Sequence, residues 1–61
     1  MEQTVEVLAE IRRETDLAWL VDDGVVQVWL PKSQVDLEDF DENGQTLFRV
    51  PEWLAEAKEL I

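Results

Sequence analysis

The 61-residue chain contains no cysteine and no histidine. The absence of cysteine excludes a disulfide framework and a thiolate metal site. The absence of histidine removes the commonest general base, the Ser-His-Asp arrangement and most zinc sites. No apolar run approaches the roughly 20 residues of a transmembrane helix, and no signal-peptide pattern opens the sequence. We therefore expect a cytoplasmic protein that is not an enzyme and needs no cofactor.

Basic residues are scarce as well. Five Lys and Arg stand against fifteen Asp and Glu, which gives a formal net charge of −10. Such a surface repels the phosphates of nucleic acids and anionic membranes, so we expect neither as a direct partner. The 46% hydrophobic content and the three Trp argue against disorder. The length allows one domain, residues 1–61, with little apolar surface to bury.

Residues 4–13 alternate between apolar and polar side chains, with Val5, Val7, Ala9 and Ile11 at every second position. This period of two is typical of a half-buried strand. A helix is the alternative, because this segment also contains good helix formers. On a helix, however, the glutamates that recur every fourth residue would stack on one face and repel one another. The pattern favours a strand.

A β-hairpin is the strongest local signal in the chain. Two β-prone runs, residues 17–21 and 25–30, flank an Asp-Asp-Gly turn. Residues 46–50 form another short β-prone run, and Pro51 then suits the first position of an amphipathic C-terminal helix. We predict an α+β domain with a small antiparallel sheet of three to four strands and one helix from about residue 51.

Residues 36–44 are rich in acids and end in Asn-Gly, which predicts a loop. Asp39, Asp41 and Asn43 match the first, third and fifth positions of the EF-hand calcium loop, with Gly44 at the sixth. The twelfth position should be a bidentate Glu, and here it is Val50. We therefore favour a solvated acidic turn and predict no metal site.

Three stretches of the sequence are similar to those of a known group. Residues 14–16 lead into LAWLV, residues 28–34 read VWLPKSQ, and residues 50–60 read VPEWLAEAKEL. Together they resemble small proteins encoded by bacteriophages and prophages, in which a W-L-P-K-S-Q stretch follows a hairpin and a P-E-W-L-A helix closes the chain. The resemblance implies a viral or mobile-element gene acting in the bacterial cytoplasm. It assigns no activity and no functional residue.

Carboxylates on one face of a strand recur roughly every 6.8 Å, and such a row can imitate the charge track of a nucleic-acid backbone. The alternative is that the acids only keep a small protein soluble. The candidates lie in the first strand and in the acid-rich segment: Glu2, Glu6, Glu10, Asp36, Glu38, Asp39, Asp41 and Glu42.

Trp19 and Trp29 are the candidate aromatic anchors of an interface. On the two runs of the hairpin we expect both on one side, with the even-numbered apolar residues on the other. Trp19 and Trp29 are then either part of the core or an exposed patch for a partner protein. Because a single small chain carries apolar residues on both sides of its hairpin, we expect a homodimer, through edge strands or through these Trp.

These observations predict a binding protein that inhibits or modulates a host protein. Its target would carry a basic surface that normally faces nucleic acid, and Trp19 or Trp29 would add apolar contact. The alternative is an accessory or structural module of phage replication or recombination without an inhibitory role. Mimicry requires the acids to gather on one face, whereas a module would spread them evenly.

Overall fold

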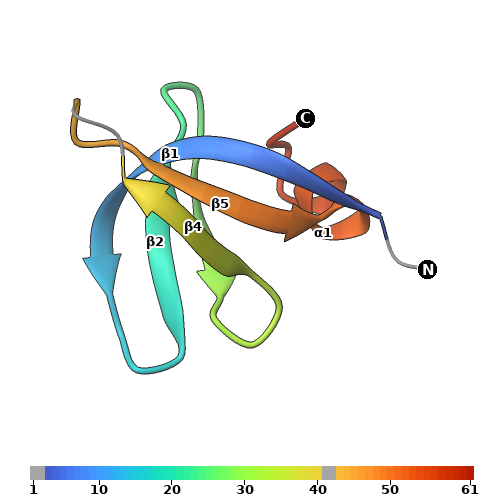
Figure 1. The fold of residues 1–61 in the computed structure, drawn as a ribbon, viewed down its shortest axis with the longest axis horizontal. Helices are drawn as coiled ribbons and strands as arrows, with labels where there is room; N and C mark the ends of the chain where they lie inside the picture. Colours follow the sequence, from blue (N-terminus) through green and yellow to red (C-terminus); the bar gives the residue numbers. More distant parts are fainter. Residues whose placement is uncertain (1–2, 41–42) are drawn as a thin grey trace.

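A computed structural model describes residues 3–40 and 43–61. It shows an α+β fold with an antiparallel sheet and one short C-terminal helix, as predicted (Figure 1). The sheet order is β3-β2-β1-β5-β4, so the described sheet has five strands rather than three to four. The elements are β1 (Thr4–Glu14), β2 (Ala18–Asp22), β3 (Gln27–Pro31), β4 (Asp36–Phe40), β5 (Thr46–Pro51) and α1 (Glu52–Ala57).

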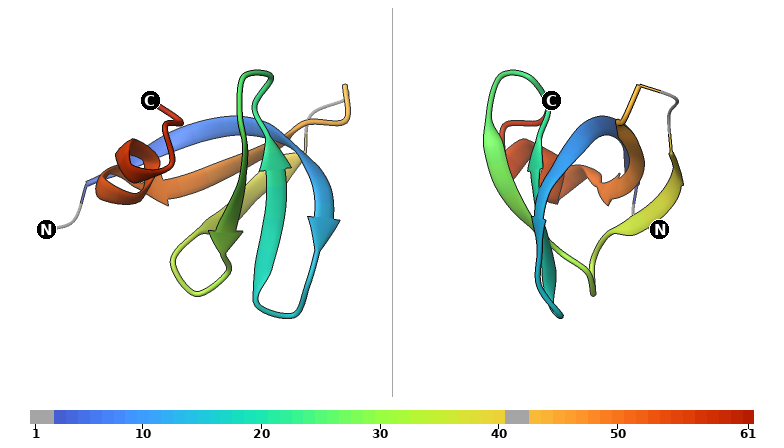
Figure 2. Two further views of the ribbon diagram at one scale, coloured as in Figure 1. Left: turned by 180° about the vertical axis from the view of Figure 1, so that it is seen from behind. Right: turned by 90° about the vertical axis from the view of Figure 1, so that its left-hand side faces the viewer.

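The long first strand organises the sheet. Val7 and Ala9 are buried and Val5 and Ile11 are half-buried, which confirms the predicted strand and its inward face. The first half of β1 pairs with β5 and the second half with β2. The register shifts beside Arg12, and a bulge of this kind bends a strand. The sheet therefore curls, with β3 and β4 at its two margins (Figure 2).

The predicted hairpin is present as β2 and β3, but its faces differ from our prediction. Trp19 lies opposite Leu30, and Leu20 lies opposite Trp29. Trp19 therefore faces the core side and Trp29 the outer side. The cause is the length of the turn: the connection from Asp23 to Val26 has four residues, and an even-numbered loop pairs odd positions with even ones.

The acid-rich segment is not a loop as predicted, because residues Asp36–Phe40 form β4. Leu37 lies opposite the buried Phe48 and is itself half-buried, so it supplies the inward contact of the strand. The acidic residues of β4 occupy solvated positions, where their charge costs no desolvation. The high charge of residues 36–44 favoured a loop in the sequence. A strand at the margin of a sheet, however, needs apolar side chains on one face only.

The core lies inside the curl and is closed at one end by α1. Phe48, Val50, Val21 and Leu30 are fully buried, and Leu54 and Ala55 of the helix complete the cluster. The helix contacts β1 and β5 (Figure 1). It begins at Glu52, one residue later than predicted. Pro51 ends β5 with an extended ψ of 137° and flanks the helix instead of entering it.

Candidate protein interface

The outer side of β1, β5 and β4 gathers acidic side chains from distant parts of the sequence. Glu6 lies opposite Arg49, and Arg49 lies opposite Asp36, so one cross-strand row runs over three strands. The next row runs from Leu8 through Leu47 to Asp39. Cross-strand partners share a face, and Val7 and Phe48 point the other way into the core. We call this outer surface the acidic face: Glu6, Leu8, Leu47, Arg49, Asp36, Glu38 and Asp39.

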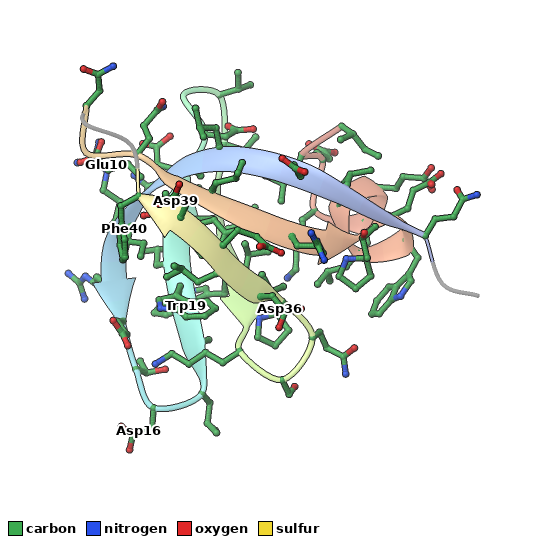
Figure 3. All side chains as sticks on the ribbon, viewed as in Figure 1. Glu10, Asp16, Trp19, Asp36, Asp39 and Phe40 are labelled. Carbon is green, nitrogen blue, oxygen red and sulfur yellow. The ribbon has the colours of Figure 1, made fainter. Side chains whose placement is uncertain are left out.

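Arg49 is the cation of the acidic face. Its Nε donates to Glu38 Oε1 at 2.9 Å, with Glu38 at the irregularity in β4. Glu6 and Asp36 flank Arg49 in its row, and among the described residues neither carboxylate forms an ion pair. Four carboxylates against one guanidinium leave a formal charge of −3 on this face. Asp36 and Asp39 lie along β4, with Glu10 further along β1 (Figure 3).

An apolar pair lies within the acidic face. Leu8 retains 43% of its exposure, and Leu47, its cross-strand partner, is half-buried. Asp39 lies next to them, and the row of Glu6, Arg49 and Asp36 runs alongside. A small apolar centre bordered by charged groups is the composition of many protein interfaces.

Several acids outside this face have local structural partners. Asp22 Oδ1 accepts the backbone N–H of Gly24 at 2.8 Å, and this bond, together with Arg12 beside the carboxylate, lowers the pKa of Asp22. Asp23 Oδ1 accepts the N–H groups of Val26 and Val25, each at 2.9 Å, and they lower the pKa of Asp23. These two carboxylates therefore hold the turn between β2 and β3.

Glu10, Glu14 and Glu52 also have local roles. Arg12 bridges Glu10 at 3.7 Å and Asp22 at 3.3 Å across β1 and β2. Glu14 accepts from Lys32 Nζ, and Glu52 lies in the first turn of α1, where a negative charge is favoured. Acidic groups with such roles account for part of the net charge without any partner protein.

Trp19 is half-buried and packs against the hydrophobic core. Its ring centroid lies 5.4 Å from that of Phe48 with the planes tilted by 54°. Lys32 Nζ lies 5.2 Å from the centroid of the Trp19 ring, so a cation covers the indole. Of the two open alternatives for Trp19, the structure favours the core.

Trp29 lies on the outer side of the hairpin and keeps 42% of its exposure. Its cross-strand neighbour Leu20 is half-buried, and Arg13 lies opposite Leu20 on β1. β3 and β4 are the two margins of the sheet and make no contact with each other in the described chain, so Trp29 lies apart from Asp36, Glu38 and Asp39. The predicted aromatic anchor and the predicted acids therefore belong to two surfaces.

Three of the predicted acids, Glu2, Asp41 and Glu42, lie outside the described residues, and so does part of the calcium-loop pattern. In the described part of the chain, no three acidic side chains come together as a metal ligand set. No helix of residues 3–40 and 43–61 is long and apolar enough to cross a membrane.

The sequence reasoning missed Arg49 and the pair Leu8–Leu47. The alternation of β5 places Arg49 and Leu47 outward, so the signal was present in residues 46–50. Which strand would lie beside β5 could not be known without the register. Comparisons of the chain with protein-family models, with curated proteins and with solved structures give no match.

Proposed function

We propose that this protein is a non-enzymatic, acidic binding protein that contacts another protein through the acidic face. The partner's complementary surface would be basic and would normally face nucleic acid. In keeping with the resemblance to phage and prophage proteins, the partner would be a host protein whose activity is inhibited or modulated. The observation that carries the proposal is the double row over β1, β5 and β4, in which Glu6, Asp36 and Asp39 surround an apolar pair.

The arrangement supports contact with a protein more than solubility alone. Acids that only solubilise need no register, whereas here residues 6, 36 and 39 meet on one surface through two strand pairings. Acids elsewhere stabilise a turn, a helix start or an ion pair. Steering by opposite charge speeds encounter, and burial of Leu8 and Leu47 would add lasting affinity.

A matched pair of charge-reversal variants tests the proposal. The face variant carries Glu6→Lys, Asp36→Lys and Asp39→Lys. The control carries Asp16→Lys, Glu56→Lys and Glu59→Lys, which are exposed residues away from the acidic face. Each set changes the net charge from −10 to −4, because each reversal adds two charges.

Tagged parent, face variant and control are then used to capture proteins from a bacterial lysate. We expect the parent and the control to retain the same nucleic-acid-handling protein and the face variant to lose it. Equal loss with both variants would show that net charge alone governs binding. Retention by the face variant would place the contact elsewhere on the molecule.

A further inference from the structure

The chain contains two glycines, and each follows an aspartate or an asparagine, as Asp23–Gly24 and Asn43–Gly44. Both pairs lie in connections between strands, and the two glycines have a positive φ of +97° and +84°. In such a pair the backbone nitrogen of glycine can reach the carbonyl carbon of the preceding side chain, because glycine has no Cβ to hinder the approach. The two pairs differ in how the structure engages the glycine N–H.

The Asp23–Gly24 pair is held by hydrogen bonds. Gly24 N–H donates to Asp22 Oδ1 at 2.8 Å, so the nitrogen that could attack Asp23 is already engaged. Asp23 Oδ1 accepts two further backbone N–H groups, each at 2.9 Å. A carboxylate is ionised at neutral pH, and in that form it is a poor acceptor of a nucleophile. This pair is therefore protected at both reacting groups.

The Asn43–Gly44 pair lies in the connection between β4 and β5. Both residues are exposed, and the segment that leads into β5 projects beyond the end of the sheet (Figure 1). Among residues 3–40 and 43–61, no group accepts a hydrogen bond from Gly44 N–H. A Cβ built at Gly44 would meet nothing within 4 Å, so the backbone at this point is not crowded. The preceding side chain is a neutral amide, which is a better electrophile than a carboxylate.

We propose that Asn43 is a site of spontaneous deamidation in the folded protein, since asparagine is one of the thermally labile residues. Gly44 N gives its proton to water or hydroxide and attacks Asn43 Cγ. The new N–Cγ bond closes a five-membered succinimide ring, and the Cγ–Nδ2 bond breaks to release ammonia.

Water then opens the succinimide ring at one of its two carbonyl carbons. Cleavage of the new N–Cγ bond gives aspartate at residue 43. Cleavage of the original peptide bond between residues 43 and 44 gives isoaspartate, in which the chain continues through Cγ. The net reaction consumes one water and releases one ammonia, with no oxidation or reduction.

Deamidation changes the protein beside the acidic face. A neutral amide becomes a carboxylate, so the formal net charge goes from −10 to −11. The site joins β4 and β5, the strands that carry Asp39 and Leu47 of the acidic face. Isoaspartate also adds one carbon to the main chain of this connection. The reaction needs only residues 43 and 44 and water, so it does not depend on the proposed function.

Peptide mapping by mass spectrometry of the aged parent protein tests the proposal. Asn43 is the one asparagine of the chain, so the expected change is confined to a single peptide. We expect the folded protein to gain the mass difference between an amide and an acid at residue 43, with isoaspartate among the products. The rate should rise with hydroxide concentration. The chain unfolded in urea supplies the reference rate, and an Asn43 that stays intact in the folded protein while it reacts in urea would overturn the proposal.

Two variants then test the chemistry. Asp23→Asn is the matched control, because it places an asparagine before a glycine whose N–H donates to Asp22. In the same folded molecule residue 23 should react more slowly than residue 43, and in urea the two rates should become similar. Equal rates in the folded protein would contradict the role of the glycine N–H. If Asp23→Asn does not fold, the comparison of the folded and unfolded parent decides.

Asn43→Gln should abolish the mass gain, because glutamine would have to close a less favourable six-membered ring. An unchanged mass gain in this variant would assign the reaction to another residue and overturn the proposal.

Discussion

The rings of Trp19 and Phe48 meet at 5.4 Å, although β2 and β5 are separated in the sheet by β1. The contact exists because β1 bends and brings the two halves of the sheet face to face. Phe48 is fully buried, so Phe48→Ala should lower the free energy of unfolding by about 3–5 kcal/mol. Denaturant unfolding followed by Trp fluorescence measures this.

The control for this substitution is Phe40→Ala, since Phe40 is largely exposed on β4. Its effect should stay within about 0.5 kcal/mol, as for most surface substitutions. A similar loss for both variants would contradict a core centred on Phe48.

The turn between β2 and β3 should make stability depend on pH. Hydrogen bonds lower the pKa values of Asp22 and Asp23 below their ordinary value of 3.8 in the folded protein. Their contribution is therefore complete above that value and is lost as the pH falls through the lower folded values. Thermal unfolding between pH ~6 and ~2 should show the melting temperature falling in the acid range.

Asp22→Asn with Asp23→Asn isolates this effect. The amide oxygens can still accept the turn hydrogen bonds, but they do not titrate. The double variant should lose less stability on acidification than the parent. A parallel fall in both proteins would show that the turn carboxylates do not contribute to it.

Gly24 adopts a φ of +97°, a backbone angle that residues other than glycine rarely adopt. An added Cβ meets nothing within 4 Å, so the cost of substitution is conformational and not steric. Gly24→Ala should lower the free energy of unfolding by roughly 1–2 kcal/mol. Gly24→Asn should cost less, because Asn tolerates positive φ. Equal stability of Gly24→Ala and the parent by chemical denaturation would contradict this.

Salt should weaken the proposed contact between the acidic face and a basic partner. The acidic face binds through exposed charges, so raising salt from about 0.05 M to about 0.3 M should weaken capture of the basic partner. Capture of the partner across one salt series, at constant protein concentration, measures this. Capture that does not change across the series would contradict a contact through exposed charges.

Local patterns predicted the class of fold and most of its elements. Alternation in β1 and the turn signal of the hairpin were sufficient, because both act within about ten residues of sequence. The β4 strand was missed because pairing with β5 outweighs the local preference of an acidic segment. The predicted faces of Trp19 and Trp29 were wrong because a loop of four residues connects the two strands. Only a loop with an odd number of residues would place both rings on one side.

The acidic face was predictable only in part. The acids of residues 36–39 and of the first strand were identified from the sequence, and their gathering on one face was stated as the requirement for mimicry. That gathering depends on the pairings of β5 with both β1 and β4, which bring residues 6 and 36 to either side of Arg49. Long-range register of this kind has no local signature.

We propose that the acidic face binds the surface of the partner protein that normally contacts nucleic acid. The most direct measurement is fluorescence anisotropy of a labelled duplex bound to the captured partner, titrated with this protein at constant salt. We expect the parent and the Asp16→Lys, Glu56→Lys, Glu59→Lys control to displace the duplex, and the Glu6→Lys, Asp36→Lys, Asp39→Lys variant to leave it bound. A duplex that stays bound while the parent protein binds the same partner would contradict it.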